Sequence, residues 1–212
     1  MVEKAGTTGR PVLTAAILQL GLLTQMILEA ERTIGYVIGI DPTEFLPQSR
    51  PGYMFVVVAL ALSVLAIVNF ILLMTWLFKA TRFIGGKTNP ALTISPGWAI
   101  GWWFIPIANF IAPFMVMTEL YNASRTPENW NKRGLPILAI LWWGATWLSI
   151  AVALGIRFGK HLTFDLPPRD LMYASIYGLG TLRLLSLLAL VTVIMRFQNS
   201  AATVESGIEK IF

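Results

Sequence analysis

Hydrophobic positions along this chain gather into long runs that short polar connectors separate. Four of these runs, at residues 12–34, 53–78, 135–158 and 171–197, are long enough to cross a bilayer as helices. A helix needs about 20 mostly apolar residues to span roughly 30 Å of hydrocarbon. The pattern therefore predicts an all-α protein built as a polytopic bundle of transmembrane helices.

A further apolar stretch, residues 96–120, contains two prolines, Pro106 and Pro113. Proline removes a backbone donor and clashes with the preceding turn, so each proline should break or kink a helix that runs through it. Non-helical backbone is tolerated at membrane depth only where protein buries it or where it lines a cavity. We therefore expect this broken segment to be a structural centre of the protein and to carry its functional surface.

The distribution of basic residues bears on whether the broken segment crosses the membrane. A full crossing gives five spans and divides the basic residues almost evenly between the two sides. If the segment instead enters the bilayer and returns, ten basic residues lie on the side of the N-terminus and five on the other. Because cytoplasmic connectors carry an excess of Lys and Arg, we expect four full spans, a re-entrant or interfacial segment, and a cytoplasmic N-terminus. Five spans are the alternative.

Composition supports a membrane protein without a separate soluble domain. Hydrophobic residues make up 56% of the chain, charged residues only 13%, and the mean hydropathy is +0.67. We expect a single integral membrane domain over residues 1–212. The net charge of +5 is spread over the connectors, which indicates contact with anionic membrane lipid and not with nucleic acid.

Several kinds of chemistry find no support in the sequence. The chain has no cysteine, which excludes disulfides and thiolate metal sites. Its one histidine, His161, lies in a polar connector and is expected to be a solvated loop residue. No phosphate-binding glycine loop or nucleophile motif is present. We therefore expect no metal and no cofactor, assign no catalytic residue, and lean against an enzyme.

One stretch of the chain resembles a known family. The match comprises residues 76–80, WLFKA, residues 95–109, SPGWAIGWWFIPIAN, and then Pro113, Met117, Glu119, Leu120 and Ser124. In these residues the chain resembles the bacterial integral membrane proteins catalogued as domain of unknown function 4328. The resemblance implies a membrane-embedded fold in a bacterial inner membrane, but no substrate or activity. Ala112 departs from the pattern, since related sequences often have a basic residue there.

Arg183 is the sharpest single candidate, because it lies near the middle of the last apolar run. A charge at the bilayer centre costs about 2.5 kcal/mol or more, so it should face the bundle and have a partner. The candidate partners are Glu29, Glu119, Asn69 and Asn109. Arg183 and its partner could bind an anion or relay protons, but we favour a structural ion pair that locks the bundle.

The broken segment and its flanks supply the other candidates. Glu119 is either a buried carboxylate with a raised pKa or the partner of a basic residue in the following connector. Asn109 is expected to satisfy the backbone freed between the two prolines. Trp98, Trp102 and Trp103 could form an aromatic wall for a lipid, although interfacial belts are the commoner use of membrane tryptophans.

Two glutamines, Gln19 and Gln25, lie in the first apolar run at a spacing that does not place them on one helix face. Interhelical hydrogen bonds explain such residues adequately. We expect both side chains to bond to neighbouring helices and to carry no chemistry.

Three functions remain open from the sequence. The leading hypothesis is a non-catalytic subunit or scaffold of a membrane complex, whose partners are membrane lipid and a membrane protein or second copy of the chain. A transporter or channel component is the alternative, with a polar site at Arg183 and Glu119 or Glu29. A lipid-modifying membrane enzyme that uses Glu119 and Asn109 ranks last.

Overall fold

The computed structural model describes residues 11–38, 51–88, 91–158 and 168–208. The described residues form six α-helices and three short 3-10 turns, and no strand occurs among them. The prediction of an all-α protein is therefore confirmed. His161 and several basic residues counted for the charge distribution lie outside the described ranges, namely Lys4, Arg10, Arg50, Lys160 and Lys210.

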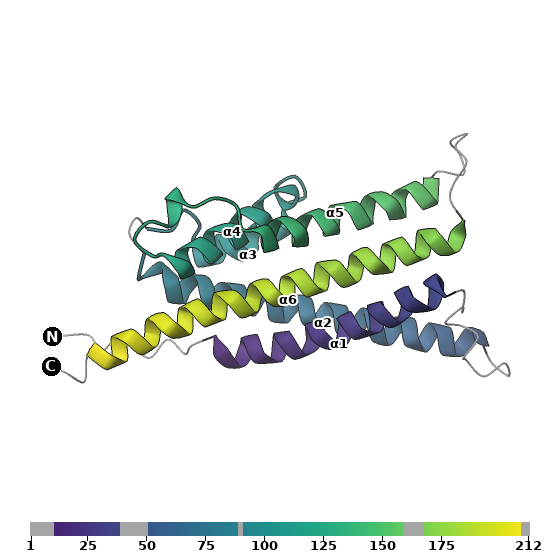
Figure 1. The fold of residues 1–212 in the computed structure, drawn as a ribbon, viewed down its shortest axis with the longest axis horizontal. Coiled ribbons are helices and arrows are strands. Elements are labelled where there is room, and N and C mark those ends of the chain that lie inside the picture. Colours follow the sequence, from purple (N-terminus) through teal and green to yellow (C-terminus); the bar gives the residue numbers. More distant parts are fainter. Residues whose placement is uncertain (1–10, 39–50, 89–90, 159–167, 209–212) are drawn as a thin grey trace. The chain divides into compact units, whose positions relative to one another are not determined.

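Four helices are long and apolar enough to cross a membrane (Figure 1). They are α1 (Val12–Val37), α2 (Pro51–Gly85), α5 (Ile137–Phe158) and α6 (Arg169–Ile208). These helices coincide with the four predicted spans. The broken segment is not among the candidate spans, as the four-span prediction requires.

Two of the long helices continue beyond the apolar run that identified them. The run at residues 53–78 lies inside a 35-residue helix, and the run at residues 171–197 lies inside a 40-residue helix. The predicted ends were too early because the apolar run marks the lipid-facing part of a helix. Residues such as Ala, Glu and Lys continue a helix equally well in water.

Each of the six described α-helices begins at or beside a proline. Proline fits the first turn of a helix because the missing N–H would have no intrahelical partner there. Pro113 was expected to interrupt a helix, but it lies in the first turn of α4 (Ala112–Arg125) and starts one. The other prolines at helix starts are Pro11, Pro51, Pro96, Pro136 and Pro168.

By its internal contacts the chain divides into two units, which are described separately. Unit 1 comprises Met1–Gln19, Phe70–Ile140 and Ala189–Phe212, and unit 2 comprises Leu20–Asn69 and Leu141–Leu188. Each long helix contributes residues to both units. Unit 1 therefore holds the whole broken segment, and unit 2 holds the larger part of α1, α2 and α5.

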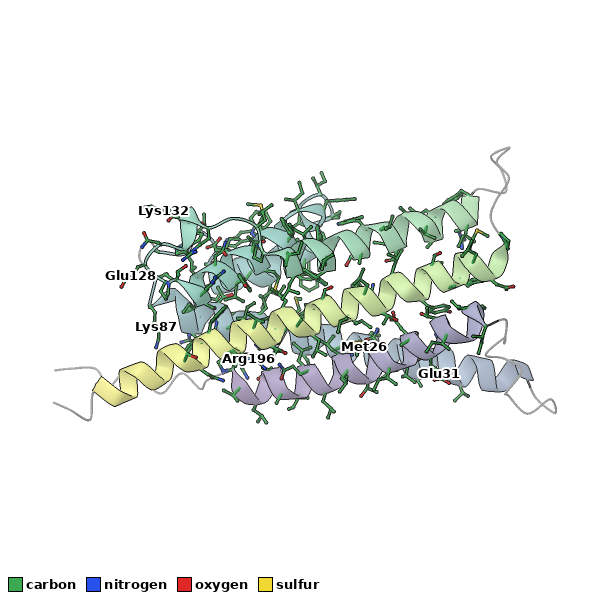
Figure 2. The ribbon with its side chains drawn as sticks, in the orientation of Figure 1. Met26, Glu31, Lys87, Glu128, Lys132 and Arg196 are labelled. Atoms are coloured by element: carbon green, nitrogen blue, oxygen red, sulfur yellow. The ribbon has the colours of Figure 1, made fainter. Side chains whose placement is uncertain are left out.

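The core of unit 1 joins the broken segment to the ends of two long helices. Trp76, Leu77 and Ile84 of α2 are fully buried. From α4 and α6 the same core receives further apolar side chains, namely Val116, Met117, Leu120, Leu190, Val191 and Ile194. Figure 2 shows Lys87, Glu128 and Lys132 together at one end of this unit, before and after the broken segment in the chain.

Candidate functional site

The broken segment begins with a short capped helix, α3 (Pro96–Gly101). Ser95 is its N-cap, and its hydroxyl accepts a hydrogen bond from the Trp98 backbone N–H at 3.4 Å. The rings of Trp98 and Trp102 lie 4.8 Å apart, between centroids. Gly101 allows this arrangement, because a Cβ there would lie only 3.2 Å from the Trp98 ring.

The chain then reverses direction at Pro106. Ile105 has extended backbone angles, as the residue before a proline prefers. The 3-10 turns Trp102–Phe104 and Ala108–Phe110 flank this point, and α4 packs back against both of them. The predicted break at Pro106 is therefore present, and residues 96–125 form a helical hairpin, called the hairpin from here on.

The tip of the hairpin, residues 105–111, presents apolar side chains at the surface. Ile107 is 86% exposed, and Ile105, Phe110 and Ile111 are exposed as well. Asn109 is half-buried, and its backbone N–H donates to the Ile105 carbonyl at 2.8 Å. The role predicted for the Asn109 side chain stays a prediction.

The hairpin is too short to span a membrane in either arm. Its longer arm, α4, has 14 residues, and at about 1.5 Å per residue it is about 21 Å long. The hydrocarbon core is roughly 30 Å thick. An arm of this length is too short for a full crossing, and re-entry of the hairpin into the membrane stays a prediction.

Glu119 holds the entry to the hairpin in place. Its Oε1 atom accepts hydrogen bonds from the backbone N–H groups of Thr93, at 2.5 Å, and Ile94, at 3.2 Å. Partial burial raises the pKa of the Glu119 carboxyl, and these two amides act in the opposite direction with a smaller effect. The Glu119 carboxylate therefore pairs with backbone N–H groups of the preceding loop. Of the two expectations for Glu119, the direction of the pKa shift agrees with the buried carboxylate.

Gln198 of α6 fastens the hairpin to the long helices. This side chain is 1% exposed, and its amide nitrogen donates to the Ser124 hydroxyl at 3.0 Å and to the Ala80 carbonyl at 3.4 Å. One residue thus connects α6 to α4 and α2. Nearby, the indole N–H of Trp76 donates to the sulfur of Met195 at 3.3 Å.

A second group of polar residues lies in unit 2, on the spans themselves. Arg183 of α6 lies 3.6 Å from Glu29 of α1, measured between Nη2 and Oε1. Gln25 donates to the same Glu29 oxygen at 3.3 Å, and Asn69 of α2 donates to Gln25 at 2.9 Å. These four side chains, called the polar network, connect α1, α2 and α6.

Two glycines make room for the polar network. A Cβ added to Gly21 would overlap with the Asn69 amide, and a Cβ added to Gly180 would overlap with the Glu29 carboxylate. Small residues let helices approach closely in lipid. Here the side chains of Asn69 and Glu29 lie directly over the backbone of a neighbouring helix, so the network is built into the packing of the spans.

Aromatic rings extend this packing along α1. The guanidinium of Arg32 lies 5.4 Å from the centre of the Tyr177 ring, and the Tyr36 ring stacks on Tyr173 and Tyr177. Arg32 is therefore held by a cation–π contact. The same helix face thus carries polar and aromatic contacts from Gln25 to Tyr36.

The predicted site residues fall into two groups. Glu29 and Arg183 meet in unit 2, whereas the hairpin of unit 1 contains the others, Trp98, Trp102, Trp103, Pro106, Asn109, Pro113 and Glu119. The prediction that Gln19 and Gln25 bond to other helices is confirmed, because Gln19 donates to Thr192 of α6 at 2.9 Å.

Sequence reasoning overlooked Lys79 and Gln198. Lys79 was counted only as a connector charge, and Gln198 lies past the last apolar run. The sequence did contain a signal for Gln198. It is a polar residue directly after the last apolar run, at a helix end that still carries apolar residues at helical spacing. Within the described ranges no three His, Asp or Glu side chains gather as a metal site would require.

Comparisons with known proteins give one match. The family model described as "Domain of unknown function (DUF4328)" matches residues 52–202, which include the hairpin, three of the four spans and most of both units. No curated protein and no solved structure matches the chain. The match covers well over half of the sequence, and the chain therefore belongs to the DUF4328 family of proteins.

Proposed function

We propose that this integral membrane protein is a non-catalytic subunit or scaffold of a membrane complex, and that the tip of its hairpin contacts another membrane-embedded chain. The observation that carries the proposal is the exposed apolar tip on irregular backbone. Among the large apolar side chains that the structure describes, Ile107 is the most exposed. The core of unit 1 fixes the hairpin, so the tip is a rigid surface.

The backbone of the tip is the reason for expecting a protein at this surface. Within hydrocarbon, irregular backbone is stable only where other protein buries it, because lipid tails cannot pair with its polar groups. The tip consists of an extended residue, a proline and one 3-10 turn. A partner chain that packs on residues 105–111 buries this irregular backbone in protein, as a position within hydrocarbon requires.

The distribution of charge supports an orientation for the complex. Unit 1 carries most of the described basic residues outside the candidate spans, namely Lys87, Arg125, Lys132 and Arg133. Cytoplasmic ends of membrane proteins carry such an excess. We therefore place the connectors of unit 1 and the N-terminus in the cytoplasm, with the spans in the inner membrane of a bacterium.

The experiment is recovery of the tagged protein from its own membrane in lipid nanodiscs, followed by native mass spectrometry. The wild type should retain a second protein chain in a fixed ratio. Ile107→Ser should lose that chain, because a hydroxyl at the centre of the tip adds a polar group that the partner cannot match. The matched control Leu60→Ser changes an exposed residue of α2 and should retain the partner. A wild type that carries no second chain of any kind would refute the proposal.

A transporter or channel component is the second candidate, and one observation favours it. The ion pair of Glu29 and Arg183 lies on membrane spans, and the Arg183 side chain remains 32% exposed. Intramembrane charges often mark ion pathways. In proteoliposomes, proton flux that Glu29→Gln abolishes and Glu31→Gln preserves would establish this function. Absence of flux in the wild type would remove proton transport from consideration.

A further inference from the structure

A groove in unit 1 runs along α2 beside the hairpin. Its floor is the face of α2 from Phe70 to Lys79, and Ile100 and Phe104 of the hairpin form the opposite wall. Its volume is about 400 Å³, within the range of about 300 to 1,000 Å³ that small-molecule sites occupy. Apart from Thr75 and Lys79, the lining side chains are apolar.

Aromatic contacts define one end of the groove. The Phe70 ring meets the rings of Trp103 and Phe104 edge to face, with centroids 5.8 and 6.3 Å away. Phe70 is the lining residue of α2 farthest from Lys79 in the sequence. The groove therefore runs from an aromatic end at Phe70 to a cationic end at Lys79.

The length of the groove matches one leaflet of a bilayer. Lys79 lies nine positions after Phe70, which corresponds to about 14 Å along a helix. Half of a hydrocarbon core roughly 30 Å thick is about 15 Å. Because Lys79 lies near the end of its candidate span, Leu60–Gly85, the groove extends from the headgroup level to about the middle of the membrane.

The charge at the outer end is suited to an anion. The Lys79 ammonium donates to the hydroxyl of Thr14, at 2.9 Å. That hydroxyl is neutral, so this contact fixes the position of the ammonium and leaves its charge available. Arg82, one helical turn farther along α2, is exposed and does not line the groove.

The volume argues against a protein helix as the occupant. A helix has a diameter of about 10 Å, so a 14 Å length of helix occupies roughly 1,100 Å³. Even the total empty space of the groove, about 730 Å³, is smaller than this. A narrow, extended apolar chain fits its dimensions better.

We propose that the groove binds one acyl chain of an anionic phospholipid, with the lipid phosphate at Lys79. The site is distinct from the hairpin tip, and it exists whether or not a partner chain covers that tip. The bound lipid fills the space between α2 and the hairpin and ties the hairpin to the long helix.

The test compares phosphatidylglycerol with neutral phosphatidylcholine in nanodiscs, with retained lipids counted by native mass spectrometry after transfer to detergent. One phosphatidylglycerol should remain per chain. Lys79→Gln should lower its retention about fivefold, since a lysine near an anionic headgroup contributes about a factor of five. Arg82→Gln is the matched control, because Arg82 carries the same charge but does not line the groove.

A second pair of variants tests the apolar part of the site. Ile71→Trp places an indole ring in the groove and should displace the bound phosphatidylglycerol. Ile67→Trp, one turn away and outside the groove lining, should leave it bound. Both positions are exposed. Equal retention of the two lipids, or equal effects of Lys79→Gln and Arg82→Gln, would overturn the proposal. So would a protein segment found cross-linked in the groove of the purified complex.

Discussion

The polar network should contribute to stability as a unit, and a double-mutant cycle at Glu29 and Arg183 measures this. Glu29→Gln removes the negative charge while keeping an oxygen that can accept from Gln25. Arg183→Met removes the positive charge and keeps a long side chain. The double variant removes both charges, so neither ion of the pair is left without its partner.

The structure sets the size of the expected effect. At 3.6 Å the two charges attract by about 4 to 5 kcal/mol at an effective dielectric constant of about 20. Most of this attraction offsets the cost of removing both ions from water. Polar contacts measured between membrane helices contribute about 0.6 kcal/mol on average and about 1.7 at most. We therefore expect a coupling free energy in the upper part of this range, about 1 to 1.7 kcal/mol.

The assay is reversible unfolding in mixed micelles, followed by helix content for the wild type, both single variants and the double variant. Each single variant should lose stability because it leaves one ion without its partner. The double variant should lose less than the sum of the two, and Glu31→Gln, at an exposed position, should be neutral. If the losses in stability are additive, with a coupling free energy below about 0.5 kcal/mol, the polar network does not stabilise the packing of the spans.

Three further predictions concern other contacts. Gly180→Ala should lower stability by moving the Glu29 carboxylate away from Arg183. Gly178→Ala should be tolerated, since its Cβ would lie at an ordinary contact distance of 3.6 Å from Thr33. Thermal unfolding compares the two variants. The stability of the wild type relative to Glu119→Gln should be greatest below pH 4.5 and should fall as the pH rises through the raised pKa of Glu119. The reason is that the folded state binds this proton more tightly than the unfolded state. Unfolding experiments from about pH 4 to about pH 8 measure the change. Gln198→Ala should cost about 2 kcal/mol by removing two buried hydrogen bonds, and faster hydrogen exchange in α4 than in α5 would show that the hairpin has loosened.

The sequence predicted the spans well because lipid imposes one strong requirement on them. A continuous apolar run of about 20 residues has few alternatives to a spanning helix. The helix ends were less predictable. The helices continue past Phe78 and Phe197, where Gln198 bonds to Ser124 of the hairpin. The length of an apolar run contains no information on such contacts or on the polar residues that continue a helix.

The candidate site was predicted in part. Arg183 was expected to have an acidic or amide partner, and among four candidates the structure selects Glu29. The choice depends on which helix faces meet, and Gly180 opposite Glu29 is the local reason for it. The two backbone bonds of Glu119 could not be predicted, because they depend on the course of the loop at Thr93 and Ile94.

The groove at Lys79 was also beyond sequence reasoning. It requires residues of α2 and of the hairpin that are more than twenty positions apart in the chain to lie beside one another. Lys79 itself looked like an ordinary connector charge at a helix end. Its bond to Thr14 and its place at the end of an apolar groove became visible only with the fold.

We propose that the hairpin enters the membrane and returns to the same side. Because the chain has no cysteine, single cysteines can be introduced at Lys87, Lys132 and Ile38, which lie outside the candidate spans, and labelled with an impermeant maleimide in intact cells and in inverted vesicles. We expect Lys87→Cys and Lys132→Cys to react from the cytoplasmic side and Ile38→Cys from the opposite side. Labelling of Lys87→Cys and Lys132→Cys from opposite sides would mean that the segment crosses fully, and it would contradict the account.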